Sequence, residues 1–239
     1  SFFMFLFISL FVVVVGFFVS FFVGRTEFAA FNLVMPLLMG LSAIGFMIGT
    51  GGSAIVAKTL GENEPEKANE YFSFLVYATL IGGLLFSLSG FFFVKPLVTA
   101  LGAEGELLNN CVLYARISFA SLTFFMLQNV FQSFFVTAEK PKLGLFVIIA
   151  AGVTNMILDF LFIAVLNFGL AGAALATVCG VCIGGLIPIF YFSRKNSSKL
   201  KLGKTKSKYA LFVVFLFILS TNSRSSFIIL FLFLVTSNI

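Results

Sequence analysis

The chain has 239 residues, of which 60% are hydrophobic and only 10% are charged, and its mean hydropathy is +1.14. A soluble domain carries about a quarter charged residues, so this composition excludes a soluble globular protein and indicates a polytopic membrane protein. The formal net charge of +6 does not indicate a nucleic-acid partner, because no aromatic stacking platform accompanies the basic residues.

Apolar stretches predict six membrane-spanning helices, since about 20 apolar residues are needed to cross a bilayer. The predicted spans cover residues 1–24, 29–57, 71–94, 110–137, 143–166 and 170–193. The first stretch is too long, and too closely followed by others, to be a cleaved signal peptide. We therefore expect an all-α polytopic membrane protein whose six-helix transmembrane bundle occupies residues 16–193, with an apolar segment at 1–15 starting the first span.

The second and sixth predicted spans contain residues that shape helix packing. Pro36 in the second span and Pro188 in the sixth are expected to bend their helices. Glycines also recur at four-residue spacing in both spans, which lets neighbouring helices approach closely: Gly45 with Gly49, and Gly180 with Gly184. Both spans are therefore predicted to lie inside the bundle.

The basic residues alternate between loops. The loops after the second, fourth and sixth spans hold most of them: Lys58 and Lys67, then Lys140 and Lys142, then seven of the fifteen between Arg194 and Lys208. The intervening loops hold only Arg25 and Lys95. The positive-inside rule therefore predicts a cytoplasmic N-terminus and a basic cytoplasmic loop at 194–208. An irregular apolar segment follows at 209–239.

The fifth predicted span contains Asp159, which is the only aspartate in the chain. A carboxylate at that depth costs about 2.5–3.5 kcal/mol on insertion scales. Asn155 stands four residues earlier, so both polar groups fall on one helix face. A helix–helix hydrogen bond without a transport role is the alternative, but such an intramembrane pair favours a cation or proton site.

The chain offers little for catalysis, because it has three cysteines and no histidine. Cys179 and Cys182 match a C-x-x-C spacing, but they lie inside an apolar helix without a neighbour that stabilises a thiolate. Without histidine there is no imidazole base and no usual transition-metal site. We therefore expect neither an enzyme nor a bound cofactor.

Seven short segments follow one another along the chain, each a weak pattern by itself: Phe21–Arg25, Ala30–Pro36, Gly49–Gly61, Phe125–Ala138, Lys140–Gly144, Gly152–Asp159 and Gly169–Thr177. In this order, from about Val19 to Lys206, they resemble the amino-terminal half of a multidrug and toxic compound extrusion (MATE) transporter. The resemblance is to the bacterial multidrug-export branch of that family.

The resemblance implies an antiporter of the bacterial plasma membrane that uses an H+ or Na+ gradient to export amphipathic, often cationic drugs. Such transporters have twelve spans in two six-helix lobes, between which access alternates. The implied partners are drug molecules, membrane lipid, and a second lobe or a second copy of the chain.

The resemblance also implies roles for individual residues. Asn155, Asp159 and Thr177 occupy matching positions of the family's cation site, and Na+ at Asp159 is the only metal expected. We further expect a substrate cavity to be lined by three amide side chains: Gln128, Gln132 and Asn32.

The chain departs from the family pattern in three respects. Val15 stands where the family has an acid in its first helix, residues 1–15 and those after Lys206 lose the pattern, and the second lobe is missing. Out-of-frame translation at the edges of a partial gene is favoured over divergence as the explanation.

Two alternatives to an antiporter remain open. A lipid-linked saccharide flippase needs cationic groups for phosphate headgroups, and only Arg116, near a span end, offers one. A remnant that does not transport is the other alternative.

Overall fold

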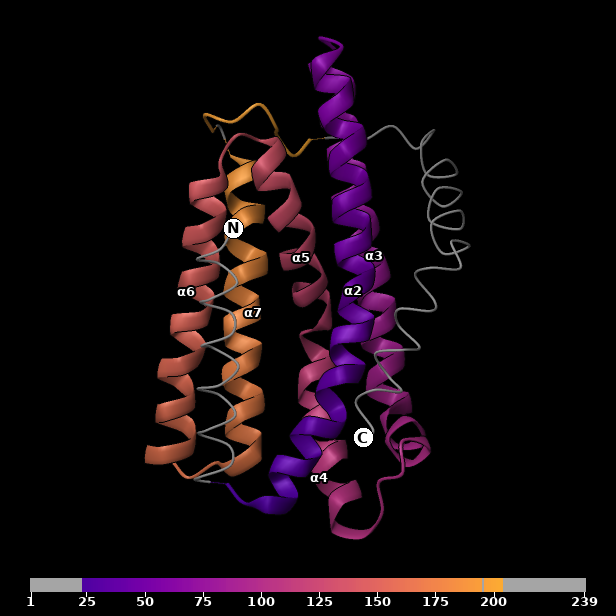
Figure 1. The fold of residues 1–239 in the computed structure, drawn as a ribbon, viewed down its shortest axis with the longest axis vertical. Coiled ribbons are helices and arrows are strands. Elements are labelled where there is room, and N and C mark those ends of the chain that lie inside the picture. Colours follow the sequence, from indigo (N-terminus) through magenta and orange to yellow (C-terminus); the bar gives the residue numbers. More distant parts are fainter. Residues whose placement is uncertain (1–22, 195, 204–239) are drawn as a thin grey trace.

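The computed structural model describes residues 23–194 and 196–203, which form a helical bundle without strands in this part of the chain (Figure 1). Its helices are α2 (Arg25–Gly61), α3 (Pro65–Ala100), α4 (Gly105–Ala120), α5 (Leu122–Thr137), α6 (Pro141–Asp159), the π-helix η1 (Phe160–Val165) and α7 (Gly169–Ser193). The predicted first span, with Val15, and the apolar segment at 209–239 lie outside the described residues.

Five predicted spans have counterparts among the described helices. α2, α3, α7 and the continuous unit of α6 with η1 are each long and apolar enough to cross a membrane. The fourth predicted span, 110–137, is divided into α4 and α5, which are long and apolar enough to cross a membrane only when taken together and are bent by 53° at the break. Pro36 and Pro188 lie inside α2 and α7, and α3 contains a further proline, Pro96.

The span predicted over 110–137 is not one continuous helix, because Ser121 interrupts it. Ser121 has φ −102° and ψ 0°, outside the α-helical region, and its hydroxyl donates to the Ser118 carbonyl at 2.9 Å. Such bonds from a serine to the preceding turn compete with the helical ladder and bend helices.

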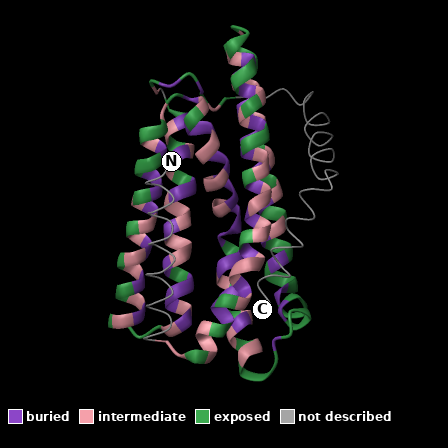
Figure 2. Ribbon diagram, in the orientation of Figure 1, coloured by how far each residue is buried: buried purple, intermediate pink, exposed green. Residues whose placement is uncertain are grey.

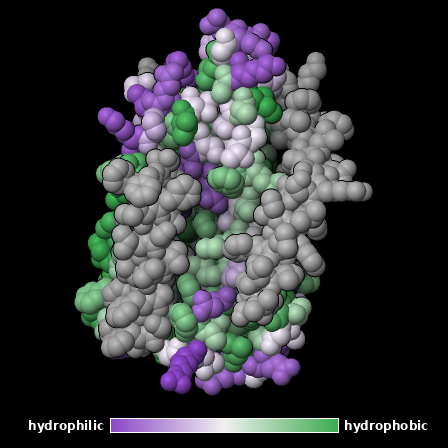
Figure 3. All heavy atoms as spheres, in the orientation of Figure 1, coloured by the Kyte–Doolittle hydropathy of each residue, from purple (hydrophilic) through white to green (hydrophobic). Residues whose placement is uncertain are grey.

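The surface between the two ends of the bundle is apolar. Hydrophilic residues gather at the top and bottom of the molecule, and the visible part of the band between them is mostly hydrophobic with a few hydrophilic residues (Figure 3). Exposed residues run along the outer edge of α6 (Figure 2), and on α3 they include Phe92, which is 72% exposed. Large apolar groups exposed in this way suit contact with lipid, as expected of an integral membrane protein.

Glycines hold the interior helices close together. A Cβ atom at Gly45 of α2 would lie 2.8 Å from the Cα of Met126 on α5. A Cβ at Gly180 of α7 would lie 3.0 Å from the carbonyl oxygen of Ala151 on α6. Both approaches leave no room for a larger side chain, which confirms the close helix packing predicted at these glycines.

Residues 196–203, in the predicted basic loop, are anchored to the bundle. The Leu200 side chain is fully buried in an apolar cluster with residues of α3, α5 and α7. Three side chains of α3 bond the backbone that follows: Asn69 accepts from the Lys201 N–H (2.7 Å), Ser73 accepts from the Gly203 N–H (2.9 Å), and Tyr77 donates to the Gly203 carbonyl (3.4 Å). The segment therefore packs against one end of the bundle, and its last described residues lie beside α3.

Candidate cation site

α6 presents a row of buried residues that ends in the two predicted polar ones. Ala151, Asn155 and Asp159 recur at four-residue spacing, so they lie on one face of the helix. Asn155 is 2% exposed and Asp159 is 0% exposed. Asp159 lies about 27 Å along the helix from Pro141, counting 1.5 Å per residue. The carboxylate therefore lies halfway between the middle of the Pro141–Val165 span and its η1 end.

α7 brings Thr177 to this face of α6. The amide nitrogen of Asn155 lies 3.4 Å from the Thr177 hydroxyl, which itself donates to the Ala173 carbonyl at 3.0 Å. A Cβ at Gly180 would lie 3.0 Å from the Asn155 Cβ, so a glycine is needed for this approach. The amide oxygen of Asn155 has no hydrogen-bond partner among the described residues.

α4 supplies two further polar groups that were not predicted, Tyr114 and Ser118. Tyr114 is fully buried, and its hydroxyl lies beside the side chains of Ser118 and Thr177, within electrostatic range of Asp159. The two residues are four apart, the same spacing that identified Asn155 and Asp159. This spacing is the feature of the sequence that could have indicated Tyr114 and Ser118 as site residues. It was not decisive, because a tyrosine and a serine in an apolar helix are also ordinary packing residues.

The polar atoms of this site are unusual because most lack a hydrogen-bond partner among the described residues. They are both carboxylate oxygens of Asp159, the amide oxygen of Asn155, and the hydroxyls of Tyr114 and Ser118. An ionised carboxylate buried without a partner costs several kcal/mol. The arrangement is therefore suited to holding a proton on Asp159 or a cation among its oxygen atoms, which are the ligands that hard cations prefer.

A π-helix begins directly after Asp159, and nothing in the sequence indicated it. η1 covers Phe160–Val165, and past its end the Leu166 N–H bonds the Leu161 carbonyl, five residues back, at 2.9 Å. Short π-helical turns within α-helices are found frequently at functional sites. The turn places the carboxylate at a change of helical geometry rather than within a regular helix.

The three amides predicted to line a substrate cavity lie in different environments. Gln128 is half-buried on α5 and packs against Gly184 of α7, and its amide oxygen has no hydrogen-bond partner among the described residues. Gln132 is half-buried one turn further along α5. Asn32 is exposed on α2 and donates to the Phe28 carbonyl of its own helix at 3.0 Å. Their role in a cavity stays a prediction.

The fold and the site define an integral membrane bundle with a buried ionisable group, an arrangement typical of secondary transporters. Residues 1–161 match the family model described as MatE, and the chain belongs to this family of transporters. The resemblance drawn from the seven segments is thereby confirmed.

Curated relatives are longer than this chain. It is 32% identical over 182 residues to "Multidrug export protein MepA" of Staphylococcus haemolyticus (strain JCSC1435), covering 76% of this chain and 40% of the relative. It is 24% identical over 190 residues to "Probable multidrug resistance protein YoeA" of Bacillus subtilis (strain 168), covering 78% and 41%. The chain therefore spans about 40% of the length of these relatives.

Solved structures show the same fold in one half of a transporter. The outward-facing conformation of a multidrug resistance MATE family transporter of the MOP superfamily matches with a TM-score of 0.80 and 24% identity, covering 87% of this chain and 47% of that one. The inward-facing conformation matches with a TM-score of 0.78 and 24% identity, covering 85% and 47%. The helical bundle thus has the fold of one transporter lobe.

Proposed function

We propose that this chain is the cation-binding lobe of an antiporter that exports amphipathic, often cationic drugs in exchange for H+ or Na+. The observation that carries the proposal is the carboxylate of Asp159, which is fully buried and accepts no hydrogen bond from the described residues. The names of the relatives, which include multidrug export, support the substrate class.

In the proposed mechanism, a proton or cation arriving at Asp159 neutralises the carboxylate within the apolar span. Asn155 contributes its free amide oxygen, and the hydroxyls of Tyr114 and Thr177 complete a set of oxygen atoms from α4, α6 and α7. Loss of the ion restores an unpaired charge, whose cost favours a rearrangement that admits water. Ion occupancy is thereby coupled to the conformation of the lobe.

Drug movement requires a second lobe, or a second copy of the chain, against which this lobe can rock. The similar likeness to outward-facing and inward-facing structures supports a lobe that moves as one body. In this proposal Gln128, Gln132 and Asn32 face the drug between the lobes.

Chemical labelling of Asp159 tests the proposed ion site in the chain itself. A lipid-soluble carbodiimide adds to protonated carboxyl groups within membranes, and mass spectrometry assigns the adduct to its peptide. We expect labelling of Asp159 in liposomes to decrease as pH rises, because the ionised form does not react. Na+ that competes with the proton will also protect Asp159 at constant pH, whereas choline will not.

The same experiment separates the two coupling ions. Protection by pH alone indicates proton coupling, and additional protection by Na+ indicates a sodium site. Asp159→Asn, which cannot form the adduct, is the control for assignment of the peptide. Labelling that is indifferent to both pH and Na+ would contradict an ion site at Asp159.

We further propose that the chain lies in a bacterial plasma membrane with its basic end, and hence its N-terminus, in the cytoplasm. At this end, Lys199 Nζ lies 2.8 Å from Glu139 Oε1, which joins the segment after α7 to the α5–α6 loop. The described basic residues in or next to the loops at this end of the bundle are Lys58, Lys67, Lys140, Lys142, Arg194, Lys199 and Lys201. The positive-inside rule supports this orientation.

Cysteine labelling from outside the cell checks the orientation. In a chain without its native cysteines, Glu104→Cys in the exposed α3–α4 loop should react with an impermeant reagent in intact cells. Ser197→Cys, also exposed but at the basic end, should react only after permeabilisation. Ser197 is preferred to the neighbouring Ser198, which is buried. Reaction at Ser197→Cys in intact cells would reverse the proposed topology.

A further inference from the structure

The break between α4 and α5 is held by a third helix, α3. The Ser87 hydroxyl donates a hydrogen bond to the carbonyl of Phe119, two residues before Ser121. In an unbroken α-helix that carbonyl would accept from the N–H of Thr123. Ser87 therefore supplies, from a neighbouring helix, a donor at the point where the bend disturbs the ladder.

The surface of α3 is shaped to receive the break. Gly83 and Gly90 stand one turn before and one turn after Ser87, on the same helix face. A Cβ at Gly83 would lie 3.0 Å from the Cα of Thr123, and a Cβ at Gly90 would overlap the ring of Phe119. Two glycines thus allow the bent segment to lie against α3, and the serine between them supplies the polar contact.

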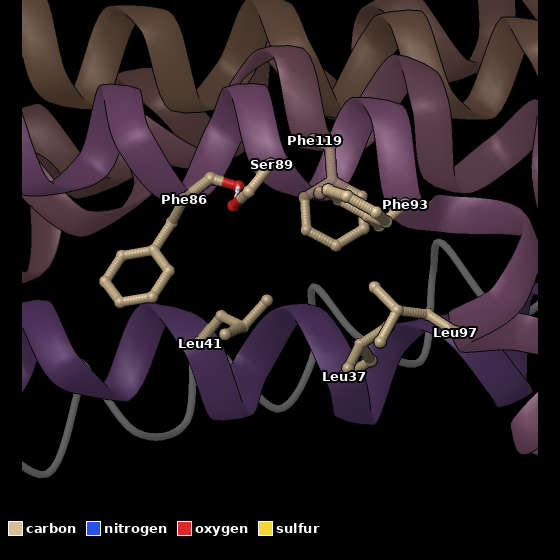
Figure 4. A pocket seen from close by; sticks show the side chains of 8 residues that line it. Leu37, Leu41, Phe86, Ser89, Phe93, Leu97 and Phe119 are labelled. Atoms are coloured by element: carbon tan, nitrogen blue, oxygen red, sulfur yellow. Dashed lines mark hydrogen bonds between the residues drawn. The ribbon is translucent and has the colours of Figure 1, made fainter.

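The other side of this contact is apolar. A groove of about 160 Å³ opens between α2 and α3, and Phe119 lies at one end of it, beside Phe93 (Figure 4). Ser89 also faces the groove, but its hydroxyl donates to the Phe86 carbonyl of its own helix at 3.1 Å. On this side Phe119 meets mostly apolar groups, so the Ser87 hydroxyl is the polar contact that α3 makes with the break.

The direction of α4 matters because the helix carries Tyr114 to within electrostatic range of Asp159, with Ser118 beside the Tyr114 hydroxyl. Ser118 is adjacent to Phe119, and Tyr114 lies one turn further from the break. A change in the bend at Ser121 would swing both hydroxyls relative to α6 and α7, which hold the rest of the site.

We propose that Ser87 is a positioning residue for the cation site: its bond to the Phe119 carbonyl fixes the bend in the fourth span, which places the Tyr114 hydroxyl beside Asp159. The proposal rests on the proposed function. Ser87 touches neither the ion nor Asp159 and acts only through α4. In its absence the i→i+4 ladder between Phe119 and Thr123 is favoured, and the span straightens.

The effect of Ser87 on the ion site is tested by measuring the rate at which the carbodiimide labels Asp159 at neutral pH, in the full chain in liposomes. Ser87→Ala is expected to speed labelling about fivefold, a size typical of coupling between connected residues. The reason is that the hydroxyl dipole of Tyr114, which lies within electrostatic range of the carboxylate, moves away and stabilises its ionised form less. Ser87→Thr, which keeps the hydroxyl, should restore the parental rate, and Ser89→Ala, the matched control, should leave it unchanged.

A double-mutant cycle asks whether Ser87 acts through Tyr114. In a Tyr114→Phe chain, Ser87→Ala should have no further effect on the labelling rate. An unchanged rate for Ser87→Ala in the parent, or an equal effect in both backgrounds, overturns the proposal. If Ser87→Ala does not fold, Ser87→Cys, with its weak thiol donor, replaces it with the same expectations.

The bend itself is measured independently of ion binding. Spin labels at the exposed positions Leu113 and Val136 lie on either side of the break. Ser87→Ala should lengthen the distance between them, because straightening moves the two ends apart, and an unchanged distance overturns the proposal. Suppose that labelling of Asp159 in the parent chain does not change with pH or Na+, but that Ser87→Ala lengthens the distance between the spin labels. This result would show that Ser87 fixes the bend although the proposed ion site is wrong.

Discussion

Asp159→Asn is expected to reduce gradient-driven drug efflux to background in a chimera where residues 16–203 replace the matching part of the staphylococcal relative. Asparagine keeps the shape of the side chain but carries no charge and exchanges no proton, so the ion no longer changes the energy of the site. Membrane insertion should be undiminished, because the substitution removes an unpaired buried carboxylate that costs about 2.5–3.5 kcal/mol to insert. Loss of activity without loss of protein is therefore the expected signature.

Ethidium efflux from energised bacteria lacking their own pumps measures this effect, with the amount of chimera in the membrane as reference. Glu104→Gln makes the same carboxylate-to-amide change at an exposed residue before α4 and should retain efflux. Efflux by Asp159→Asn at the rate of the parent chimera would remove Asp159 from the coupling mechanism.

The spans could be predicted because they depend on composition, but the break at Ser121 could not. Residues 110–137 read as a continuous apolar stretch, and a lone serine is compatible with a straight helix. The bend depends on Ser87, which lies on another helix and meets the break only after folding. In the same way, residues 196–203 read as a basic loop, and the burial of Leu200 depends on an apolar cluster to which α2, α3, α5, α6 and α7 all contribute.

The site was predictable where its residues share one helix. Asn155 and Asp159 are four residues apart, and a carboxylate in an apolar span is costly enough to be informative by itself. Thr177 was assigned only by resemblance to the family, because a threonine in a helix commonly bonds its own backbone, as it does here to Ala173. Tyr114 was missed, since an aromatic residue in an apolar helix has an ordinary role in packing.

The 239-residue chain expressed by itself is expected not to export drug. Cells without their own pumps should retain as much ethidium with this chain as with an empty vector. Alternating access needs a second bundle to rock against, and the helix faces that would line the drug pathway otherwise meet lipid or another copy. The resemblance to the family also implies an acid where this chain has Val15, so under the proposed function Asp159 would have to couple ion and drug movement alone.

The physical reason for this expectation is the cost of exposing polar groups to lipid. The Gln132 side chain is only half-buried in the single lobe, and hydrocarbon offers its amide no hydrogen bonds. Pairing with a second copy, or degradation, removes that cost, and only pairing leaves a chain that could transport. Asp159→Ala is the control that separates transport from leakage. Robust, gradient-dependent efflux that is lost in this control would contradict the prediction, because it would mean that two copies of one lobe supply both halves of the transporter.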